Sequence, residues 1–393
     1  MRTDRTSRLP AFYTHVIGSL PRPKLILDLL GKRDEMPADE YAGIMDEMVV
    51  FAIRLQEQAG LDVVSDGEWR RTQYIKEFLQ RIGGFKRVRE FHHQGETKLT
   101  EVVVERMIEP EDPVFHKDAE FLNEHTNRLT KFALPSPFLI VTRYWHEEHS
   151  RDAYPTRQDF TDHLVRILRR EAEALVEAGI DIVQLDDPAL TYFCDRELMA
   201  SGGTHDERLK QDWNPESQIP KAIESINKIL DGLQAEVHLH CCHSVYKRMS
   251  DVSGDYKPIL PYLEGARIDR INLEFAYQGT GNVTDLSLLP EHLGIGMGVV
   301  DVRGEKLQTV DEIESLAVEA TALVSPERIA LNPDCGFAPD AEEPPTIDEA
   351  YEKATQMVQE NWTAITDIAE ALLKYETLQA EECERLLRGE RLE

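Results

Sequence analysis

The chain has 393 residues, enough for one large domain or a few smaller ones. Its 73 acidic and 44 basic residues give a formal net charge of -29, which argues against a nucleic-acid or anionic membrane partner and favours a small-molecule ligand. The five cysteines are scattered and form no disulfide framework, and the sequence shows no secretory leader and no apolar run of about 18 residues. These features predict a cytoplasmic protein.

Junctions between a helix and a strand recur along the chain. Residues 12–17 read as a short buried strand, and a helix from about 39 to 59 stops at a glycine and leads into a strand at 61–65. The same junction returns where Ala178-Gly179 precedes a strand at 180–185. Repeated units of this kind predict alternating strands and helices.

Residues 81–131 differ from the rest of the chain. They contain a β-rich run at 98–106 and the turn residues Gly83 and Gly84. We expect a β-hairpin excursion above the main sheet, between the second and third strands. After it, the apolar run 138–142 reads as the third strand.

Eight strands are predicted in all. They begin near Phe12, Leu61, Phe138, Ile180, Glu236, Arg270, Leu293 and Arg328. Helical patterns lie between most of them and continue to a last helix at about 347–373. This alternation predicts an α/β fold, a TIM (β/α)8 barrel that forms a single domain over residues 1–393 and ends in a charged tail at 374–393.

The conspicuous polar residues all fall where the predicted strands end. They are Ser19, Glu68, Asp186, His240, Glu274, Asp301 and Cys335. The carboxyl ends of the strands form one mouth of a barrel, so we expect these scattered residues to be neighbours.

Soft metal ligands gather in the segment 237–246, VHLHCCHSVY. Side chains alternate along a strand, so His238, His240 and Cys242 share a face. Zinc suits mixed imidazole and thiolate ligands and needs about four of them. The best completing residues are two that follow later strands, Glu274 and Cys335.

A single buried His or Cys more often packs than binds a metal. The alternative interpretation of His238 and Cys241 is therefore that they are buried neutral residues without a role in metal binding. The sequence leaves open whether His238, Cys241 or His243 contributes to the metal site, and packing or supporting roles are the default interpretation.

Several short motifs together resemble one family. In chain order they are Ile17-Gly18-Ser19, Asp66-Gly67-Glu68, residues 184–189 (QLDDPA), His240-x-Cys242, Glu274 and residues 332–336 (NPDCG). Each motif alone is weak, but in this order they resemble the C-terminal catalytic barrel of cobalamin-independent methionine synthase.

This resemblance implies a site for zinc and a thiol substrate. The implied zinc ligands are His240, Cys242, Glu274 and Cys335, with Glu274 the ligand most readily exchanged for the incoming thiol. The residues implied to bind homocysteine are Ile17, Gly18, Ser19, Glu68 and Asp186. Carboxylates suit an α-amino group, and backbone N–H donors suit an α-carboxylate.

The sequence departs from the family pattern on the side of the methyl donor. Asp187 shortens a family glutamate, and residues 300–304 (VDVRG) stand where the family has an imidazole, so that Arg303 replaces it. Trp145 is the nearest candidate for a folate-stacking tryptophan. With Asp186, the residues assigned catalytic roles are Asp301 and Arg303.

The resemblance implies a zinc-dependent methyltransferase that transfers a methyl group from a methyltetrahydropteroyl-glutamate donor to homocysteine, through a zinc-bound thiolate. One alternative keeps this chemistry and changes the electrophile or thiol, to an epoxide with coenzyme M or to a methylated corrinoid. More distant alternatives are a porphyrin-carboxylate decarboxylase, a zinc hydrolase and a non-catalytic binding protein. The expected partners are a small thiol and an alkyl donor, without nucleic acid or membrane; the sequence does not decide whether the chain forms a homo-oligomer.

Overall fold

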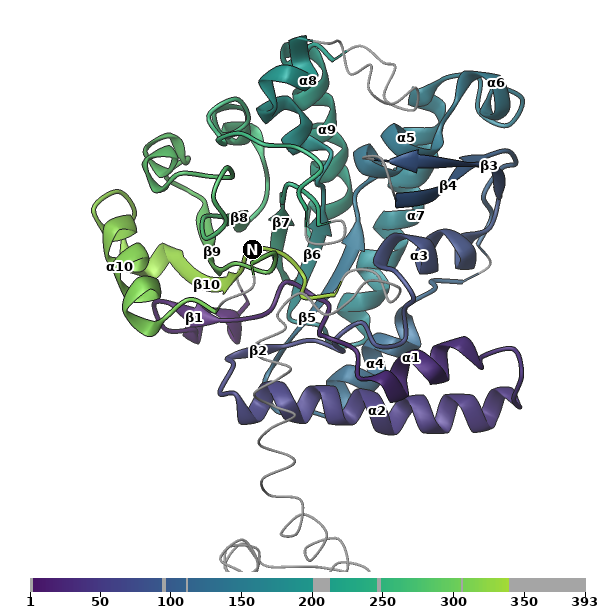
Figure 1. The fold of residues 1–393 in the computed structure, drawn as a ribbon, viewed down its shortest axis with the longest axis horizontal. Coiled ribbons are helices and arrows are strands. Elements are labelled where there is room, and N and C mark those ends of the chain that lie inside the picture. The colour runs from purple at the N-terminus through teal and green to yellow at the C-terminus, as the bar shows by residue number, and fades with distance from the viewer. Residues whose placement is uncertain are drawn as a thin grey trace, which may run out of the picture. The chain divides into compact units, whose positions relative to one another are not determined.

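Eight parallel strands form the centre of the fold in this computed structural model, which describes residues 3–93, 97–110, 112–200, 213–245, 249–304 and 307–338. The strands are β1 (Tyr13–Thr14), β2 (Val63–Val64), β5 (Leu129–Pro135), β6 (Ile182–Asp186), β7 (Glu236–His240), β8 (Arg270–Glu274), β9 (Gly294–Val300) and β10 (Ile329–Pro333). Their order is β1-β10-β9-β8-β7-β6-β5-β2, and a parallel bridge between His15 and Val63 brings the two end strands together. The predicted TIM barrel is thus confirmed (Figure 1).

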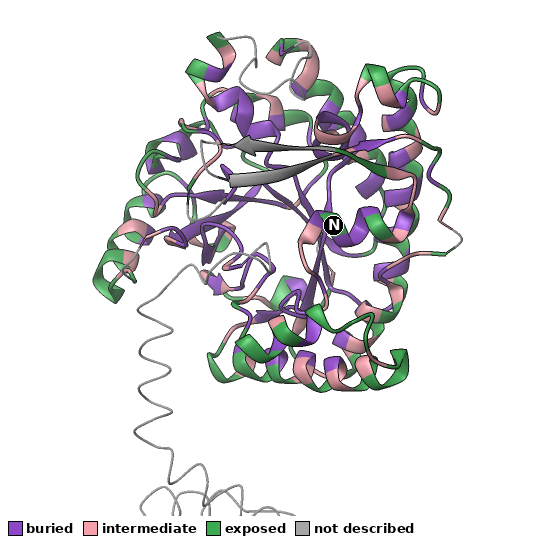
Figure 2. Cartoon of the chain, turned by 45° about the vertical axis from the view of Figure 1, so that its right-hand side comes forward, coloured by how far each residue is buried: buried purple, intermediate pink, exposed green. Residues whose placement is uncertain are grey.

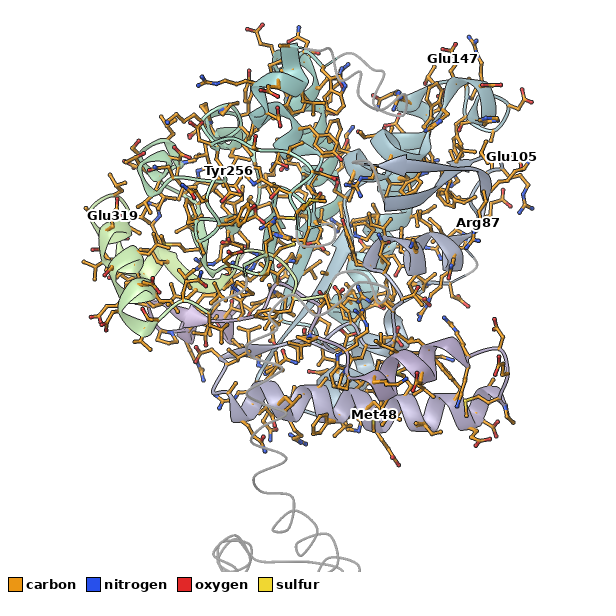
Figure 3. All side chains as sticks on the ribbon, viewed as in Figure 1. Met48, Arg87, Glu105, Glu147, Tyr256 and Glu319 are labelled. Carbon is orange, nitrogen blue, oxygen red and sulfur yellow. The ribbon has the colours of Figure 1, made fainter. Side chains whose placement is uncertain are left out.

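Helices surround these strands and cover their outer face (Figure 1). The α-helices are α1 (Lys24–Gly31), α2 (Ala38–Gln58), α3 (Tyr74–Ile82), α4 (His116–Glu124), α5 (Pro137–Tyr144), α6 (Glu147–Ser150), α7 (Arg157–Glu177), α8 (Arg196–Ala200), α9 (Pro215–Leu230) and α10 (Val310–Thr321). Short 3₁₀ helices occur at Thr6–Arg8, Leu190–Cys194, Leu260–Gly265, Val283–Leu288 and Pro326–Arg328. The strands are buried, whereas exposed residues gather on the outer helix faces, as at Glu147 and Glu319 (Figures 2 and 3). No helix among the described residues is long and apolar enough to cross a membrane.

The local sequence determines where helix α7 begins, where it ends and how the chain continues into β6. Thr156 caps its first turn and forms a capping box with Asp159, which satisfies backbone N–H groups that have no helical partner. Leu164 and Leu168 are fully buried on its inner side. The helix ends before Gly179, whose φ of 91° is readily adopted only without a Cβ, and the chain turns directly into β6.

The third barrel strand lies earlier than the sequence pattern indicated. It is β5, whereas the apolar run 138–142 belongs to α5, whose first turn contains Pro137 and is capped by the Ser136 hydroxyl. A short continuous apolar run fits a buried helix as well as a buried strand, so the prediction of a strand at Phe138 was wrong.

A β-hairpin does occur between β2 and β5. Its strands β3 (Phe85–His93) and β4 (Thr97–Val104) pair antiparallel and form a separate two-stranded sheet. The predicted helix at 347–373 and the charged tail at 374–393 lie outside the described residues.

Candidate metal centre and active site

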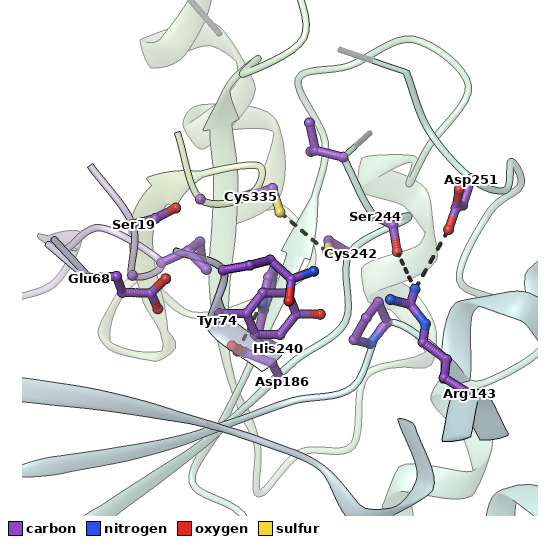
Figure 4. Close-up of a pocket in the computed structure, with 16 residues that line it drawn as sticks. Ser19, Glu68, Tyr74, Arg143, Asp186, His240, Cys242, Ser244, Asp251 and Cys335 are labelled. Carbon is purple, nitrogen blue, oxygen red and sulfur yellow. Dashed lines mark hydrogen bonds and ion pairs between the residues drawn. The ribbon is translucent and has the colours of Figure 1, made fainter. Parts of the chain in front are cut away.

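One cavity opens at the carboxyl ends of the barrel strands (Figure 4). Its lining residues are Ile17, Gly18, Ser19, Glu68, Gln73, Tyr74, Arg143, Asp186, Pro188, His240, Cys242, Ser244, Val245, Asp251, Cys335 and Gly336. Most of the sequence-predicted site residues therefore meet in one place, as a barrel mouth requires.

Three soft ligands converge in this cavity. His240 ends β7, Cys242 follows it by two residues, and Cys335 follows β10. One ligand atom from each lies within 4.8 Å of the others, and all three residues are buried. His240 Nε2 is buried without a hydrogen-bond partner, which suits a nitrogen that awaits a metal. Among the described residues, this is the one group of His, Cys and carboxylate side chains with such spacing, and its donor set fits zinc.

A hydrogen bond joins the two sulfur atoms. The Cys335 thiol donates to Cys242 Sγ across 3.4 Å, and this contact, with the nearby His240 ring, lowers the pKa of Cys242 to about 5 against the opposing effect of burial. Burial acts to lower the pKa of His240, but the Cys242 thiolate and Asp186 outweigh it and raise that pKa to about 10. The pair therefore carries a thiolate at neutral pH, the form that binds metals.

Asp186 orients the histidine. Its Oδ1 lies 3.2 Å from His240 Nδ1 and accepts a hydrogen bond of 2.7 Å from Gln184 Nε2. Gln184 also donates to the Ile17 carbonyl at 3.1 Å. A carboxylate on the far ring nitrogen leaves Nε2 directed at a metal and fixes the ring orientation.

Glu274 lies outside the three-residue metal group. Its Oε1 accepts a hydrogen bond of 2.7 Å from Arg303 Nη2, and its Oε2 lies 2.8 Å from His243 Nδ1 and accepts from the His243 backbone N–H at 3.0 Å. Burial acts to raise the pKa of Glu274, but Arg303 and His243 outweigh it and lower that pKa to about 2. The carboxylate is therefore ionised and fully paired.

Glu68 and Ser19 line one side of the cavity (Figure 4). Burial raises the pKa of Glu68 to about 7, although Arg71 opposes it at 3.5 Å. The residue has a φ of 56°, a conformation that costs free energy and is concentrated at functional sites. A Cβ at position 18 would lie 2.5 Å from Glu68 Oε1, so Gly18 permits this approach.

The other side of the cavity contains residues that sequence reasoning missed. Arg143 Nη2 donates to the hydroxyls of Tyr192 at 3.1 Å and Ser244 at 3.4 Å and lies 3.6 Å from Asp251 (Figure 4). Ser244 has a φ of 60°, so a second conformationally strained residue lines the cavity. A correct reading of 137–144 as a helix could have pointed to Arg143 instead of to Trp145, two residues further on.

Four predicted site residues are not among those that line the cavity: Glu274, described above, and Trp145, Asp301 and Arg303. Trp145 donates its indole N–H to the Tyr154 carbonyl at 3.0 Å and stacks against Arg157. Asp301 accepts a hydrogen bond of 2.7 Å from the backbone N–H of Arg303. Arg303 itself is buried against Glu274.

The remaining candidates near the metal group have other partners. His238 Nε2 lies 3.0 Å from Glu236 Oε1, and His243 supports Glu274. Cys241 is fully buried, its pKa is raised by burial, and its carbonyl accepts a hydrogen bond from Tyr256. These contacts agree with the supporting and packing roles expected for these residues.

The barrel mouth thus combines a candidate metal site, made of one imidazole and two cysteine sulfurs, with a cavity that can hold a small molecule. The family described as Cobalamin-independent synthase, Catalytic domain, matches residues 12–360. The chain belongs to this family, and it is an enzyme of the methyltransferase class that the family represents.

Relatives extend along nearly the whole chain. A methionine synthase from Pyrococcus abyssi is 28% identical over 357 residues, covering 89% of this chain and 92% of the relative. A methionine synthase from Sulfolobus acidocaldarius is 27% identical and covers 85% and 87%. The solved structure of a B12-independent methionine synthase from Shewanella, in complex with selenomethionine, has a TM-score of 0.67 at 23% identity and covers 84% of this chain and 92% of that chain. This structural likeness supports the same barrel fold.

Proposed function

We propose that this enzyme methylates homocysteine to methionine with the help of one zinc ion. The observation that carries the proposal is the convergence of His240, Cys242 and Cys335 in the same cavity as Glu68 and Asp186. The methionine synthases of similar length among its relatives support the same conclusion.

The nucleophile in this proposal is the substrate thiol, and three residues of the chain would hold the zinc that activates it. Zinc held by His240, Cys242 and Cys335 would stabilise a substrate thiol as its thiolate at neutral pH. Asp186 serves this chemistry by holding the His240 ring through Nδ1. Asp301 would act only indirectly, because its carboxylate accepts a hydrogen bond from the backbone N–H of Arg303 and so orients that residue.

The chain's own residues would bind the amino-acid part of homocysteine. Glu68 and Asp186 face the cavity with carboxylates that suit the α-ammonium group. The backbone N–H groups around Ile17, Gly18 and Ser19 suit the α-carboxylate. The thiol of a substrate held in this way reaches toward the cysteines on the neighbouring wall.

The methyl donor in this proposal is of the methyltetrahydropteroyl-glutamate type. A second candidate keeps the thiol chemistry and uses another electrophile, an epoxide or a methylated corrinoid. The observation that favours it is that Trp145, the aromatic contact expected for a folate ring, is not among the lining residues.

The test combines metal content with product formation. The wild type, purified without added metal, should contain about one zinc per chain and form methionine from homocysteine with one of the two methyl donors. Cys335→Ser should lose most of the zinc and the activity, while Cys194→Ser, which replaces a buried free cysteine outside the metal group, should keep both. Wild-type protein without zinc, or zinc that survives Cys335→Ser, would refute the proposal.

We also place the enzyme in the cytoplasm. The four cysteines in the described part of the chain are all free. A reducing compartment preserves the Cys242 and Cys335 thiols, whose sulfur atoms lie 3.4 Å apart.

A further inference from the structure

One wall of the cavity has no part in holding the metal or the amino-acid part of homocysteine. It is formed by Arg143, Ser244 and Asp251, which lie on the side of the cavity away from Ser19 and Glu68 (Figure 4). Arg143 belongs to α5, whereas Ser244 and Asp251 belong to the chain that follows β7. We call these three residues the Arg143 wall.

The guanidinium of Arg143 has donors to spare. Its Nη2 donates to the hydroxyls of Tyr192 at 3.1 Å and Ser244 at 3.4 Å, and Asp251 lies 3.6 Å away, beyond hydrogen-bond distance. Its Nε and Nη1 form no hydrogen bond within the described part of the chain. The side chain is 20% exposed, so these N–H groups can meet a molecule that enters the cavity.

Arginines with a purely structural role in this protein are paired differently. Arg303 Nη2 lies 2.7 Å from Glu274, and Arg81 lies 2.9 Å from Glu77 and 3.0 Å from Asp118. Each of these guanidinium groups has a carboxylate within hydrogen-bond distance, whereas Arg143 has only neutral hydroxyls there. A largely buried cation is unfavourable without a close counter-ion, so an anionic ligand would complete the surroundings of Arg143.

The Arg143 wall is formed before any ligand arrives. Ser244 has a φ of 60°, and its carbonyl accepts a hydrogen bond of 2.7 Å from Arg303 Nη2, which holds this strained residue in place. The Ser244 hydroxyl in turn accepts from Arg143. A guanidinium held in this way loses little conformational freedom when it binds an anion.

The position of the wall restricts which molecule supplies the anion. Ser244 follows Cys242 by two residues, and both line the same cavity, so a molecule bound at Arg143 is also close to the metal group. In the proposed function, the charged groups of homocysteine are bound on the side of Ser19 and Glu68. The anion at Arg143 therefore belongs to the other substrate.

On the basis of the proposed function, we infer that Arg143 binds an acidic group of the alkyl donor. A guanidinium fork binds a carboxylate through two parallel hydrogen bonds, and the available N–H groups of Arg143 suit this arrangement. The donor is thus an anion whose carboxylate contacts Arg143 while its alkyl group faces the substrate thiol. Two kinds of donor share this chemistry, a pteroyl-glutamate with its carboxylates on the glutamate and a short carboxylic acid that carries the alkyl group.

Binding of two acidic probes tests the inference without turnover. Calorimetry in saturating homocysteine, which occupies its own side of the cavity, would use 4-aminobenzoyl-glutamate as the acidic end of the long donor and succinate as a short dicarboxylate. The wild type should bind at least one of them, and Arg143→Gln should weaken that binding at least about tenfold. Succinate binding indicates a short donor, and binding of the longer probe alone indicates a pteroyl-glutamate.

Two further variants separate binding from a structural effect. Arg143→Lys keeps the charge without the fork and should recover part of the affinity. Arg157→Gln is the matched control, because Arg157 donates to the Val141 carbonyl of α5 at 3.2 Å but does not line the cavity, and it should leave probe binding unchanged. In the active enzyme, Arg143→Gln should raise the KM of the donor about tenfold and keep the zinc content and the KM of homocysteine.

The outcomes distinguish this inference from the function on which it depends. An enzyme that contains zinc and forms methionine, but binds neither probe or binds them equally well in the wild type and in Arg143→Gln, would overturn the inference alone. A wild type that binds a probe through Arg143 but contains no zinc would refute the proposed function and keep Arg143 as a site for an acidic ligand.

Discussion

Two histidines on β7 lie two residues apart, point into the same barrel and have opposite chemistry. His240 faces the Cys242 thiolate and Asp186, which raise its pKa to about 10 despite its burial. His238 faces Glu236, but burial and nearby cations lower its pKa to about 4. The comparison shows that the surroundings of a buried imidazole in this barrel, and not the residue type, set its pKa.

We call the buried polar residues around His238 the lower layer of the barrel, namely His15, Lys131, Gln184 and Arg270, and the cavity-lining residues around His240 the upper layer. Lys131 Nζ lies 2.9 Å from His15 Nδ1 and donates to Gln184 Oε1 at 3.0 Å, while Arg270 donates to the Ile295 carbonyl at 2.7 Å. None of these residues lines the cavity, whereas the upper layer does. The lower network supports the strands, and the upper one faces the substrate.

Replacing each of the two histidines by alanine should give the largest difference between the two layers. His240→Ala should reduce the zinc content from about one per chain to below about one tenth, because one of three ligands is lost. His238→Ala should keep the zinc and lower the free energy of unfolding by about 2–4 kcal/mol, because it leaves a cavity and removes one contact of the buried Glu236 carboxylate. Metal analysis and urea unfolding measure both effects; zinc loss in the His238 variant alone would place the metal in the lower layer.

Asp186 links the two layers, because it contacts both His240 and Gln184. Asp186→Asn keeps the shape of the side chain but removes the charge that favours a directed Nδ1–H. We expect zinc affinity to fall about 10- to 100-fold, measured by competition with a chelator. An unchanged affinity would show that the Asp186 contact does not orient the ligand.

Lys131 gives the lower layer a pH dependence of its own. Burial lowers its pKa from 10.5 to about 7. Between these values the unfolded chain binds more protons at this residue than the native chain, so stability should rise with pH, by about 2 kcal/mol between pH 7 and pH 9. Lys131→Met should lack this increment in urea unfolding; parallel wild-type and variant curves would contradict the assignment.

Glu68 should make ligand binding in the upper layer depend on pH, with a smaller free-energy effect than that of Lys131 on stability. Its pKa of about 7 leaves it largely neutral at pH 6 and ionised at pH 8. Because only the ionised form attracts an α-ammonium group, methionine, which has no thiol to titrate, should bind about tenfold more tightly at pH 8 than at pH 6. Calorimetry of the wild type and of Glu68→Gln, which should bind weakly at both values, tests this; an equal pH dependence in the variant would exclude Glu68 as its origin.

Sequence patterns predicted much of this molecule because they are local. The repeated helix, glycine and strand junctions predicted the barrel, since glycine after a helix directs the chain back toward the sheet. The spacing of His240 and Cys242 at a strand end predicted a metal group, because the period of a strand places both on one face. The position of Cys335 after a later predicted strand made it a candidate ligand, because the carboxyl ends of barrel strands meet at one mouth.

The tertiary structure alone decided which side chains pair. An apolar run is compatible with a strand or a helix, so only packing showed that 138–142 is helical and that Arg143, not Trp145, lines the cavity. Likewise, sequence order placed Glu274 at the barrel mouth, but its partners come from the segment after β7 and from the loop after β9. Ion pairs between segments distant in sequence depend on the register and twist of the closed sheet, and no residue pattern along the chain encodes them by itself.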